Sequence, residues 1–300
     1  MDYTCIKETA EKYGAEILFN ENTAKYTSFN IGGSCDVLVK ANSAECIRGL
    51  IASCRKNSIK YYVFGKCSNI LISDNGLRGV VILISGDYSG ISVDDTLIEC
   101  EAGATLSKVC LTARDKCLSG MEFAYGIPGT VGGGLYMNAG AYGGEMKDIV
   151  EYCTYLNEKG EIVRSEREEL DLSYRHSRFT GTGDIILTVG LRLKKGDKEE
   201  ISARMNELMG KRKSSQPLEY PSAGSTFKRP EGDFAARLIE ASGLKGYSCG
   251  GAEVSEKHSG FVINKNNATA EDVLKVVEGV KKKVFEDSGI MLECEMLIIE

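Results

Sequence analysis

The 300-residue chain has no tryptophan, four prolines and two histidines, and these shortages exclude several kinds of site. The histidines, His176 and His258, are far apart in sequence, so we expect no structural zinc site and no other metal centre. The eleven cysteines are odd in number and include no C-x-x-C pair. We therefore interpret them as reduced, buried side chains rather than as disulfides or metal ligands.

Positive net charge and long apolar runs are also lacking. The net charge is −6, so non-specific binding to nucleic acid or to an anionic membrane is not expected. No run approaches the ~20 apolar residues that a spanning helix needs, and residues 1–8 lack the apolar core of a signal peptide. The composition is that of a globular protein, and the length suggests two or three domains. We expect a cytoplasmic protein.

Glycine, in contrast, is concentrated in the middle of the chain, at residues 126–134 (GIPGTVGGG) and 138–144 (NAGAYGG). Because glycine loses more backbone freedom on folding than any other residue, we expect neither a helix interior nor a strand interior there. Two interpretations stay open: a cluster of tight turns, or a loop whose N–H groups bind phosphate oxygens. A Rossmann dinucleotide site is rejected, since the spacing is G-x-x-G-x-x-G and no sustained helical pattern follows.

The rest of the sequence predicts a mixture of strands and helices. Thr105 and Thr269 are predicted helix N-caps, and either Asn42 or Ser43 is predicted to cap another helix, because apolar residues follow each at helical spacing. A further helix is predicted near Ile201, after an expected linker at residues 194–198. Strands are predicted where β-branched and aromatic residues run together: up to Val39, and at 60–64, 80–84, 97–101, 149–155, 186–193, 261–264 and 292–299.

Three polar segments are candidate sites. Residues 65–69 (GKCSN) follow the strand at 60–64 and form either a pyrophosphate cradle or an ordinary turn. Residues 172–179 (LSYRHSRF) combine two arginines with a histidine and aromatics, and are either a surface loop or part of a site. The final strand would put Glu293 and Glu295 on one face, as solvated carboxylates or as site residues.

Seven segments, taken in order, resemble the UDP-N-acetylenolpyruvoylglucosamine reductase (UDP-N-acetylmuramate dehydrogenase) family, the flavoenzymes of peptidoglycan precursor synthesis. The matching segments are 26–33 (YTSFNIGG), 65–69, 126–133, 138–143, 174–179 (YRHSRF), 221–228 (PSAGSTFK) and 292–296 (LECEM). Each segment alone is a weak signal, but all seven in the family's order are highly specific.

The resemblance implies an α+β fold. It has a two-lobed FAD-binding module of the vanillyl-alcohol-oxidase (PCMH) type and a third α+β domain that binds the substrate. We expect an N-terminal FAD-binding lobe at 1–85, a second FAD-binding lobe at 86–196 and a substrate-binding domain at 197–300. The segment between the arginine motif and the serine motif is too short for the tyrosine-bearing insertion of one form of the family. The chain therefore resembles the shorter form.

The resemblance also implies the site residues. Arg175, Ser225 and Glu295 stand where the family's catalytic residues stand, and Glu293 is the weaker alternative to Glu295. FAD is expected to bind without a covalent bond, because neither histidine lies in a glycine-rich loop. Its expected contacts come from three loops: Gly65, Lys66, Cys67, Ser68, Asn69, Gly126, Pro128, Gly129, Thr130, Gly132, Gly133, Asn138, Gly140 and Ala141. The expected substrate contacts are two tyrosines and two cations: Tyr142, Tyr174, Arg212 and Lys228.

In the implied reaction, NADPH reduces FAD, and the reduced enzyme then saturates the enolpyruvyl ether of UDP-N-acetylglucosamine enolpyruvate to give UDP-N-acetylmuramate. Arg175 would stabilise charge that develops on the substrate carboxylate. Glu295 would need a pKa above the ordinary ~4.3 of glutamate, since a bare carboxylate would repel that charge. Ser225 would protonate the carbanionic carbon, assisted by Lys228, Arg229 or water.

Two other functions stay open: another FAD-dependent oxidase of the same superfamily, and a flavin-binding protein without turnover. The expected partners are the enolpyruvyl UDP-sugar and NADPH, with no nucleic acid and no membrane. The oligomeric state is left open, with a monomer as the working expectation.

Overall fold

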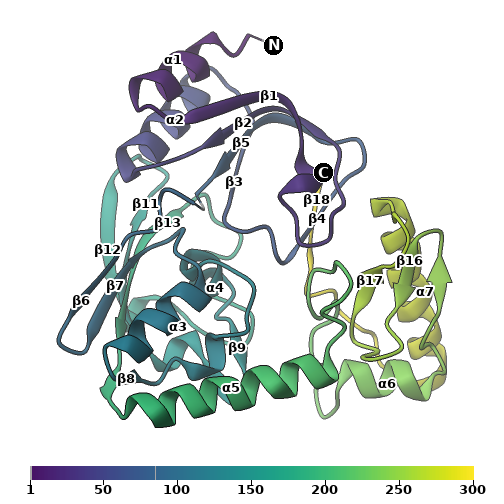
Figure 1. The fold of residues 1–300 in the computed structure, drawn as a ribbon. Coiled ribbons are helices and arrows are strands. Elements are labelled where there is room, and N and C mark those ends of the chain that lie inside the picture. Colours follow the sequence, from purple (N-terminus) through teal and green to yellow (C-terminus); the bar gives the residue numbers. More distant parts are fainter. Residues whose placement is uncertain (1, 85) are drawn as a thin grey trace. The chain divides into compact units, whose positions relative to one another are not determined.

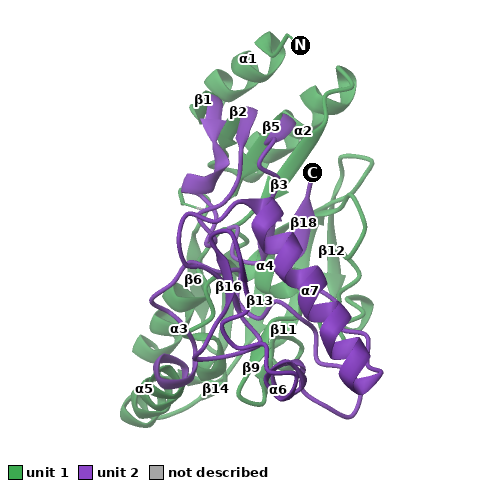
Figure 2. Ribbon diagram, turned by 90° about the vertical axis from the view of Figure 1, so that its right-hand side faces the viewer, with its two compact units in different colours: residues 1–19, 37–66, 79–211 green, residues 20–36, 67–78, 212–300 purple. Residues whose placement is uncertain are grey.

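The computed structural model describes residues 2–84 and 86–300, and the chain divides into two compact units. Unit 1 consists of Met1–Phe19, Val37–Lys66 and Gly79–Lys211, and unit 2 consists of Asn20–Asp36, Cys67–Arg78 and Arg212–Glu300 (Figure 2). Each unit is therefore assembled from three separate stretches of sequence. The predicted division into three domains stays a prediction, and its first boundary, at residue 85, lies outside the described residues.

Helices and strands alternate along much of the chain, in the order predicted for an α+β protein (Figure 1). The α-helices are α1 Thr4–Lys12, α2 Ala44–Lys56, α3 Leu106–Asp115, α4 Val131–Tyr136, α5 Lys198–Ser215, α6 Ala235–Ala241 and α7 Ala270–Ser288. Short 3-10 turns occupy Thr23–Lys25, Glu122–Ala124, Met146–Asp148 and Arg167–Glu169. The strands up to the middle of the chain are β1 Glu16–Asn22, β2 Ser34–Lys40, β3 Tyr61–Phe64, β4 Ile70–Ile72, β5 Leu77–Leu83, β6 Ile91–Asp94, β7 Leu97–Glu101, β8 Leu118–Ser119 and β9 Gly140–Ala141. The later strands are β10 Gly144–Glu145, β11 Val150–Leu156, β12 Ile162–Glu166, β13 Ile185–Arg192, β14 Lys194–Lys195, β15 Ser248–Cys249, β16 Ala252–Val254, β17 Val262–Asn264 and β18 Leu297–Ile299.

The predicted helix starts are confirmed by their capping bonds. The hydroxyl of Ser43 accepts the backbone N–H of Cys46, and the hydroxyl of Thr105 accepts that of Lys108. Thr269 forms a full capping box with its partner three residues on. Such caps satisfy N–H groups that a helix start leaves without a partner. The apolar face predicted for the last helix is buried, since Val273, Val277, Val280 and Val284 are all at most 1% exposed.

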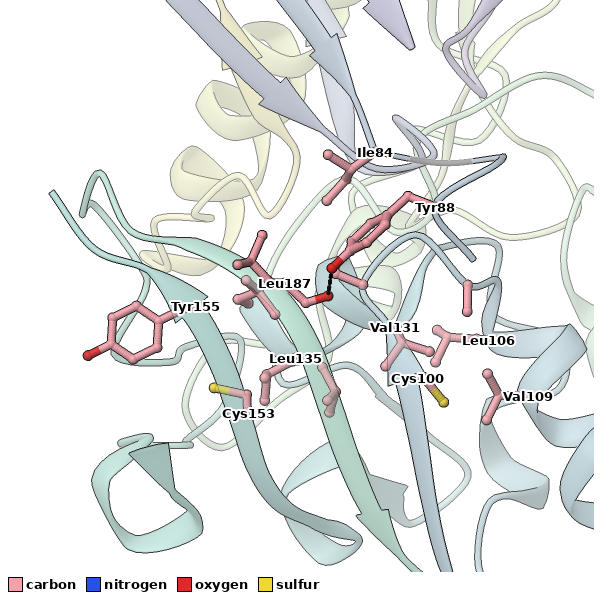
Figure 3. Close-up of a cluster of buried hydrophobic side chains, with 14 of the residues drawn as sticks. Ile84, Tyr88, Cys100, Leu106, Val109, Val131, Leu135, Cys153, Tyr155 and Leu187 are labelled. Carbon is pink, nitrogen blue, oxygen red and sulfur yellow. Dashed lines mark hydrogen bonds between the residues drawn. The ribbon is translucent and has the colours of Figure 1, made fainter. Parts of the chain in front are cut away.

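Unit 1 is organised around an antiparallel sheet with strand order β12-β11-β13-β7-β6. Helix α4 packs on β13 and β7 and contributes Val131 and Leu135 to the core (Figure 3). Those side chains lie with Cys100 and Leu187 of the sheet in one buried cluster. The sheet therefore fixes the helix that follows the central glycine loop.

A second sheet has the order β1-β2-β5-β3, in which β3 pairs with β5 in parallel. Unit 2 holds a three-stranded antiparallel sheet, β15-β16-β17, against which α7 packs. It also holds the parallel pair of β4 and β18, in which Leu297 lies opposite Ile70. This pair brings the C-terminal end of the chain beside the segment that follows the polar loop at 65–69.

Three sequence predictions need correction. The glycine-rich stretch does contain a helix interior, because α4 runs through three successive glycines, residues 132–134. The linker predicted at 194–198 is ordered: β14 pairs with β8, and α5 begins at Lys198. The last strand is shorter than predicted and begins at Leu297 rather than at residue 292.

Packing explains why α4 forms in spite of its glycines. A Cβ on Gly132 would lie 2.7 Å from the Cβ of Ala102, and one on Gly134 would lie 3.4 Å from Leu106. The helix therefore approaches Ala102, the residue after β7, too closely for a side chain at position 132, and residue 134 packs against Leu106 of α3. Thr130 caps its start by accepting the N–H of Gly133 at 3.3 Å. Tertiary contacts thus override the low helix propensity of glycine.

Candidate active site

Two predicted cofactor loops meet within unit 1. A Cβ on Gly65 would lie 2.4 Å from Oγ1 of Thr130, which is 1% exposed, so only glycine allows this approach. Gly129 accepts the N–H of Leu106, and Thr130 accepts that of Gly134 through its carbonyl oxygen. Among the described residues, the N–H groups of Gly129 and Thr130 themselves donate to no protein acceptor. They are available to an anionic ligand at the start of α4.

The loop at 65–69 contains an exposed lysine followed by a buried cysteine whose backbone has a positive φ. Lys66 is exposed, while Cys67 is 5% exposed and has φ 50°. Burial raises the pKa of the Cys67 thiol to about 12, so it stays protonated at neutral pH. In the described part of the chain, the N–H groups of Lys66 and Ser68 make no hydrogen bond to another protein group. This geometry fits a loop that offers backbone donors to phosphate oxygens.

The predicted cofactor residues therefore fit a group such as FAD, which carries a pyrophosphate. Four backbone N–H groups in these loops are not used within the described part of the protein: those of Lys66, Ser68, Gly129 and Thr130. Gly126 and Ala141 are half-buried, and Pro128 and Gly133 are exposed. The individual contacts of these residues with a cofactor stay predictions.

The third glycine stretch forms a small hairpin in unit 1. Gly140 pairs with Glu145, and Ala141 pairs with Gly144. Tyr142 and Gly143 form the two-residue turn, with φ 53° and 87°. Positive φ at both corners matches the right-handed twist of hairpin strands. Tyr142 is 39% exposed at the tip, where a ligand can reach it.

Asn138, predicted as a cofactor contact, is fully buried. Its Nδ2 donates to Oε2 of Glu145 at 2.7 Å and to the carbonyl oxygen of Ser173 at 2.9 Å. Its Oδ1 accepts the backbone N–H of Lys147 at 2.8 Å. Both N–H groups of the side chain are thus used inside unit 1. The prediction of a direct contact with the cofactor is untested, and the observed bonds link the hairpin to the segment that carries Arg175.

Arg175 lies in a tight turn of unit 1. Ser173 and His176 exchange two backbone hydrogen bonds of 3.2 Å, which close the turn around Tyr174 and Arg175. The guanidinium carbon lies 5.1 Å from the centre of the Tyr174 ring, within range of a cation–π contact. Tyr174 is 50% exposed and Arg175 is half-buried. Tyr174, a predicted substrate contact, and Arg175, a predicted catalytic residue, therefore lie in the same turn with their side chains in contact.

Ser225 and Glu295 are brought together in unit 2, although 70 residues separate them in sequence. The N–H of Glu295 donates to the carbonyl oxygen of Thr226 at 2.8 Å, and Phe227 pairs with Cys294 in a β-bridge. Both side chains are half-buried. Among the described residues, the Ser225 hydroxyl makes no hydrogen bond to another protein group, so it is available to a ligand.

The Ser225 loop is held from its other side by β17. The N–H of Thr226 donates to the carbonyl oxygen of Gly260 at 2.8 Å, and its Oγ1 accepts the N–H of Val262 at 2.9 Å. Asn69 of the polar loop also joins this group, since its Nδ2 donates to the carbonyl oxygen of Glu295 at 3.2 Å. Unit 2 thus gathers one predicted cofactor residue with two predicted catalytic residues.

The two predicted substrate cations, Lys228 and Arg212, also belong to unit 2. Lys228 pairs with Glu293 at 3.2 Å, and that carboxylate is exposed, whereas Glu295 is half-buried. This difference favours Glu295 over Glu293 as the carboxyl group that meets a ligand. Arg212 is 9% exposed, and its Nη1 donates to Oε1 of Gln216 at 3.1 Å. Its proposed contact with the substrate stays a prediction.

Sequence reasoning missed the role of Ser177. Its hydroxyl donates to the carbonyl oxygen of Tyr136 at 2.7 Å, which ties the Arg175 turn to the end of α4. No local pattern signals this bond, because the partners are 41 residues apart and one of them is a backbone atom. Position in the 174–179 motif is the only hint that the sequence contains.

Within residues 2–84 and 86–300, no group of three His, Cys, Asp or Glu side chains is arranged to hold a metal ion. None of the helices described in the chain has the length and apolar character needed to span a bilayer.

Two protein families match the chain. The family described as "FAD binding domain" matches residues 35–166, and the family described as "UDP-N-acetylenolpyruvoylglucosamine reductase, C-terminal domain" matches residues 216–299. Among curated relatives, the UDP-N-acetylenolpyruvoylglucosamine reductase of Clostridium novyi is 48% identical over 284 residues, which cover 95% of this chain and 92% of the relative. That of Caldanaerobacter subterraneus is 47% identical over 284 residues and covers 95% and 94%.

Solved structures of similar fold also match the chain. The UDP-N-acetylenolpyruvylglucosamine reductase from Thermus caldophilus matches with a TM-score of 0.80 at 35% identity, over 95% of this chain and 99% of the other. An alkyldihydroxyacetonephosphate synthase matches with a TM-score of 0.51 at 14% identity, over 65% of this chain and 41% of the other. That second likeness is one of fold alone. The predicted α+β fold class, with an FAD-binding module of the vanillyl-alcohol-oxidase type, is confirmed.

Proposed function

Because the chain belongs to the UDP-N-acetylenolpyruvoylglucosamine reductase family, we propose that it reduces UDP-N-acetylglucosamine enolpyruvate to UDP-N-acetylmuramate in peptidoglycan precursor synthesis. The observation that supports this most strongly is the pairing of Thr226 with Glu295. This backbone bond joins the loop that carries Ser225 to the segment that carries Glu295, which supports a reaction with a proton donor and an acidic partner. A cytoplasmic location and a monomeric state belong to the same proposal.

FAD, bound without a covalent link, would supply the hydride for this reduction, with NADPH as the reductant that restores it. The residues that would hold FAD are those of the loops 65–69, 126–133 and 138–141. Their glycines let the backbone approach closely, and N–H groups such as those of Gly129 and Thr130 can bind the pyrophosphate.

Arg175 would bind the carboxylate of the enolpyruvyl group. Negative charge develops on that group during the reaction, and a fixed positive charge stabilises it without reorganisation. A guanidinium is permanently charged and its fork matches a carboxylate. Two backbone hydrogen bonds between Ser173 and His176 close the turn from which the Arg175 side chain projects.

Glu295 would act as a hydrogen-bond donor in its protonated form. An ionised carboxylate would repel the developing charge, whereas a neutral carboxyl group can donate to it. The Glu295 side chain is half-buried, and its backbone N–H is held by the carbonyl oxygen of Thr226.

Ser225 would donate the proton that completes the product. An alcohol is a weak acid, so it can protonate only a strongly basic carbon, with help from a nearby cation or water. Lys228 and Arg229 follow Ser225 closely in sequence. Arg212 and Lys228 are also our candidates for binding the diphosphate of the substrate.

The test of these roles is a separation of the two half-reactions in Ser225→Ala. Flavin reduction by NADPH should stay within about twofold of the unmodified enzyme, while reoxidation by the enolpyruvyl UDP-sugar should slow by at least about 100-fold. Ser222→Ala, in the same loop, is the matched control and should leave both half-reactions near normal. Equal losses in the two half-reactions would refute the proton-donor assignment.

A further inference from the structure

Arg175 has a backbone conformation that arginine rarely adopts. Its φ is 54°, at the third residue of the turn closed by Ser173 and His176. A positive φ at this place normally belongs to glycine or asparagine. Such a conformation persists only where the surroundings over-determine it. Groups that brace the turn therefore decide where the guanidinium stands.

Asn138 braces the first residue of the turn. Its Nδ2 donates to the carbonyl oxygen of Ser173, and its Oδ1 accepts the N–H of Lys147. A backbone N–H can only donate, so the bond from Lys147 fixes which end of the amide is oxygen. The amide nitrogen then points at two acceptors, Ser173 and Glu145. Since Asn138 is 0% exposed, water does not compete for these hydrogen bonds.

Ser177 braces the other end of the turn. It is 0% exposed, its hydroxyl donates to the carbonyl oxygen of Tyr136, and its N–H donates to Oγ1 of Thr180 at 3.2 Å. Tyr136 is the last residue of α4, and Asn138 follows it by two positions. Hydrogen bonds therefore connect both ends of the turn to residues 136–138, at the C-terminal end of α4. The N-terminal end of the same helix is capped by Thr130.

We propose that Asn138 and Ser177 are positioning residues for Arg175, and that they link its place to the helix that begins at the glycine loop. The inference rests on the proposed function, in which Arg175 acts on the substrate. A purely structural role of the two residues would lower overall stability. A positioning role loosens the turn locally and slows only the half-reaction that uses Arg175.

The test uses the full-length, FAD-loaded protein with two independent variants. Ser177→Ala removes one hydroxyl, and Asn138→Gly removes the amide while still allowing positive φ, so either can carry the test if the other folds poorly. Tyr88→Phe is the matched control in unit 1, since it deletes a buried hydroxyl that donates to the carbonyl oxygen of Leu187 at 3.0 Å (Figure 3). Among the described residues, no hydrogen bond joins Tyr88 or Leu187 directly to residues 173–177.

The first readout is amide hydrogen exchange, which does not depend on activity. Exchange in a peptide that covers 173–177 should become about tenfold faster in either variant, as expected for loss of one net hydrogen bond, and should not change in Tyr88→Phe. Unchanged exchange at 173–177 in both variants would overturn the proposal. Equal acceleration throughout unit 1 would also overturn it, because that result indicates a general loss of stability.

The second readout is a double-mutant cycle on flavin reoxidation by the enolpyruvyl UDP-sugar. Ser177→Ala, which lies outside the proposed FAD loops, should slow reoxidation about tenfold and leave reduction by NADPH within about twofold. In an Arg175→Gln background, the same substitution should add less than about twofold, because it acts through Arg175. A multiplicative loss in the double variant would overturn the proposal. An unmodified enzyme that the sugar does not reoxidise would instead contradict the proposed function, which distinguishes the two failures.

Discussion

Gly65 lies so close to Thr130 that a methyl group on the glycine would stand 2.4 Å from the threonine hydroxyl oxygen. The two residues belong to different loops, and both loops match segments of the reductase family that we propose hold FAD. Their contact makes each loop depend on the other. A change at Gly65 should therefore affect flavin binding through Thr130, which caps α4.

Gly65→Ala should lower FAD affinity by at least about tenfold, because the new Cβ must displace Thr130 or its own loop. The measurement is the flavin-to-protein absorbance ratio after gel filtration, followed by FAD titration of the apoprotein. Gly210→Ala is the control: this exposed glycine lies inside α5 with open space around it. That change should leave FAD binding intact and raise stability by ~0.5–1 kcal/mol. Full flavin content in Gly65→Ala would contradict the account.

Asp74 should stabilise α7 within unit 2. Its Oδ1 accepts the N–H of Ala270 at 2.8 Å, and its Oδ2 accepts that of Glu271 at 3.1 Å, so the carboxylate sits at the positive end of the helix. Asp74→Ala should lower the free energy of unfolding by about 1 kcal/mol. Urea titration measures this change. Glu231→Ala, at an exposed position, should have no comparable effect, and equal losses in both variants would argue against a capping role.

Asp233 should make stability depend on pH in the acid range. Hydrogen bonds from Arg237 and from the N–H of Phe234 lower the pKa of Asp233 from 3.8 to about 2. A depressed folded-state pKa contributes stability that is present above about pH 4 and lost as the pH falls towards 2. Arg237→Leu should therefore be less stable than the unmodified protein at pH 5, and the gap should close on acidification. A gap that stays constant from pH 5 to the acid end would refute this linkage.

The cysteines should differ sharply in their reactivity towards iodoacetamide. Cys117 is exposed, whereas burial raises the pKa of Cys67 and of Cys100 to about 12. At pH 8 only roughly 1 in 10,000 of such buried thiols is ionised, and the thiolate is the reactive form. Peptide mapping after brief labelling should find Cys117 modified and Cys67 intact. Rapid modification of Cys67 would mean that its loop is open in solution.

Local signals predicted much of the fold correctly. Ser43, Thr105 and Thr269 were predictable caps because a capping side chain bonds only two or three residues away. Three strands of the five-stranded sheet in unit 1, β7, β11 and β13, were also predicted, since β-branched and aromatic residues run together there. Features that depend on distant partners were not predicted. Helix α4 forms because Gly132 packs on Ala102, and nothing in residues 126–134 reveals that contact.

The site was predictable only in part, for the same physical reason. The family resemblance supplied Ser225 and Glu295, and the backbone bond from Glu295 to Thr226 brings them together in unit 2. The composition did not reveal that each unit is assembled from three stretches of chain. The points at which the chain passes from one unit to the other have no linker-like sequence. The bonds that Asn138 and Ser177 make to backbone carbonyls were equally invisible, since any residue type presents a carbonyl.

Anaerobic mixing of the yellow, FAD-loaded protein with NADPH, followed by addition of UDP-N-acetylglucosamine enolpyruvate, tests the central claim most directly. The account predicts rapid bleaching by NADPH and then full return of the flavin absorbance with one equivalent of the sugar, accompanied by UDP-N-acetylmuramate. A flavin that stays bleached with the sugar and recolours only when dioxygen is admitted would contradict the account and indicate an oxidase.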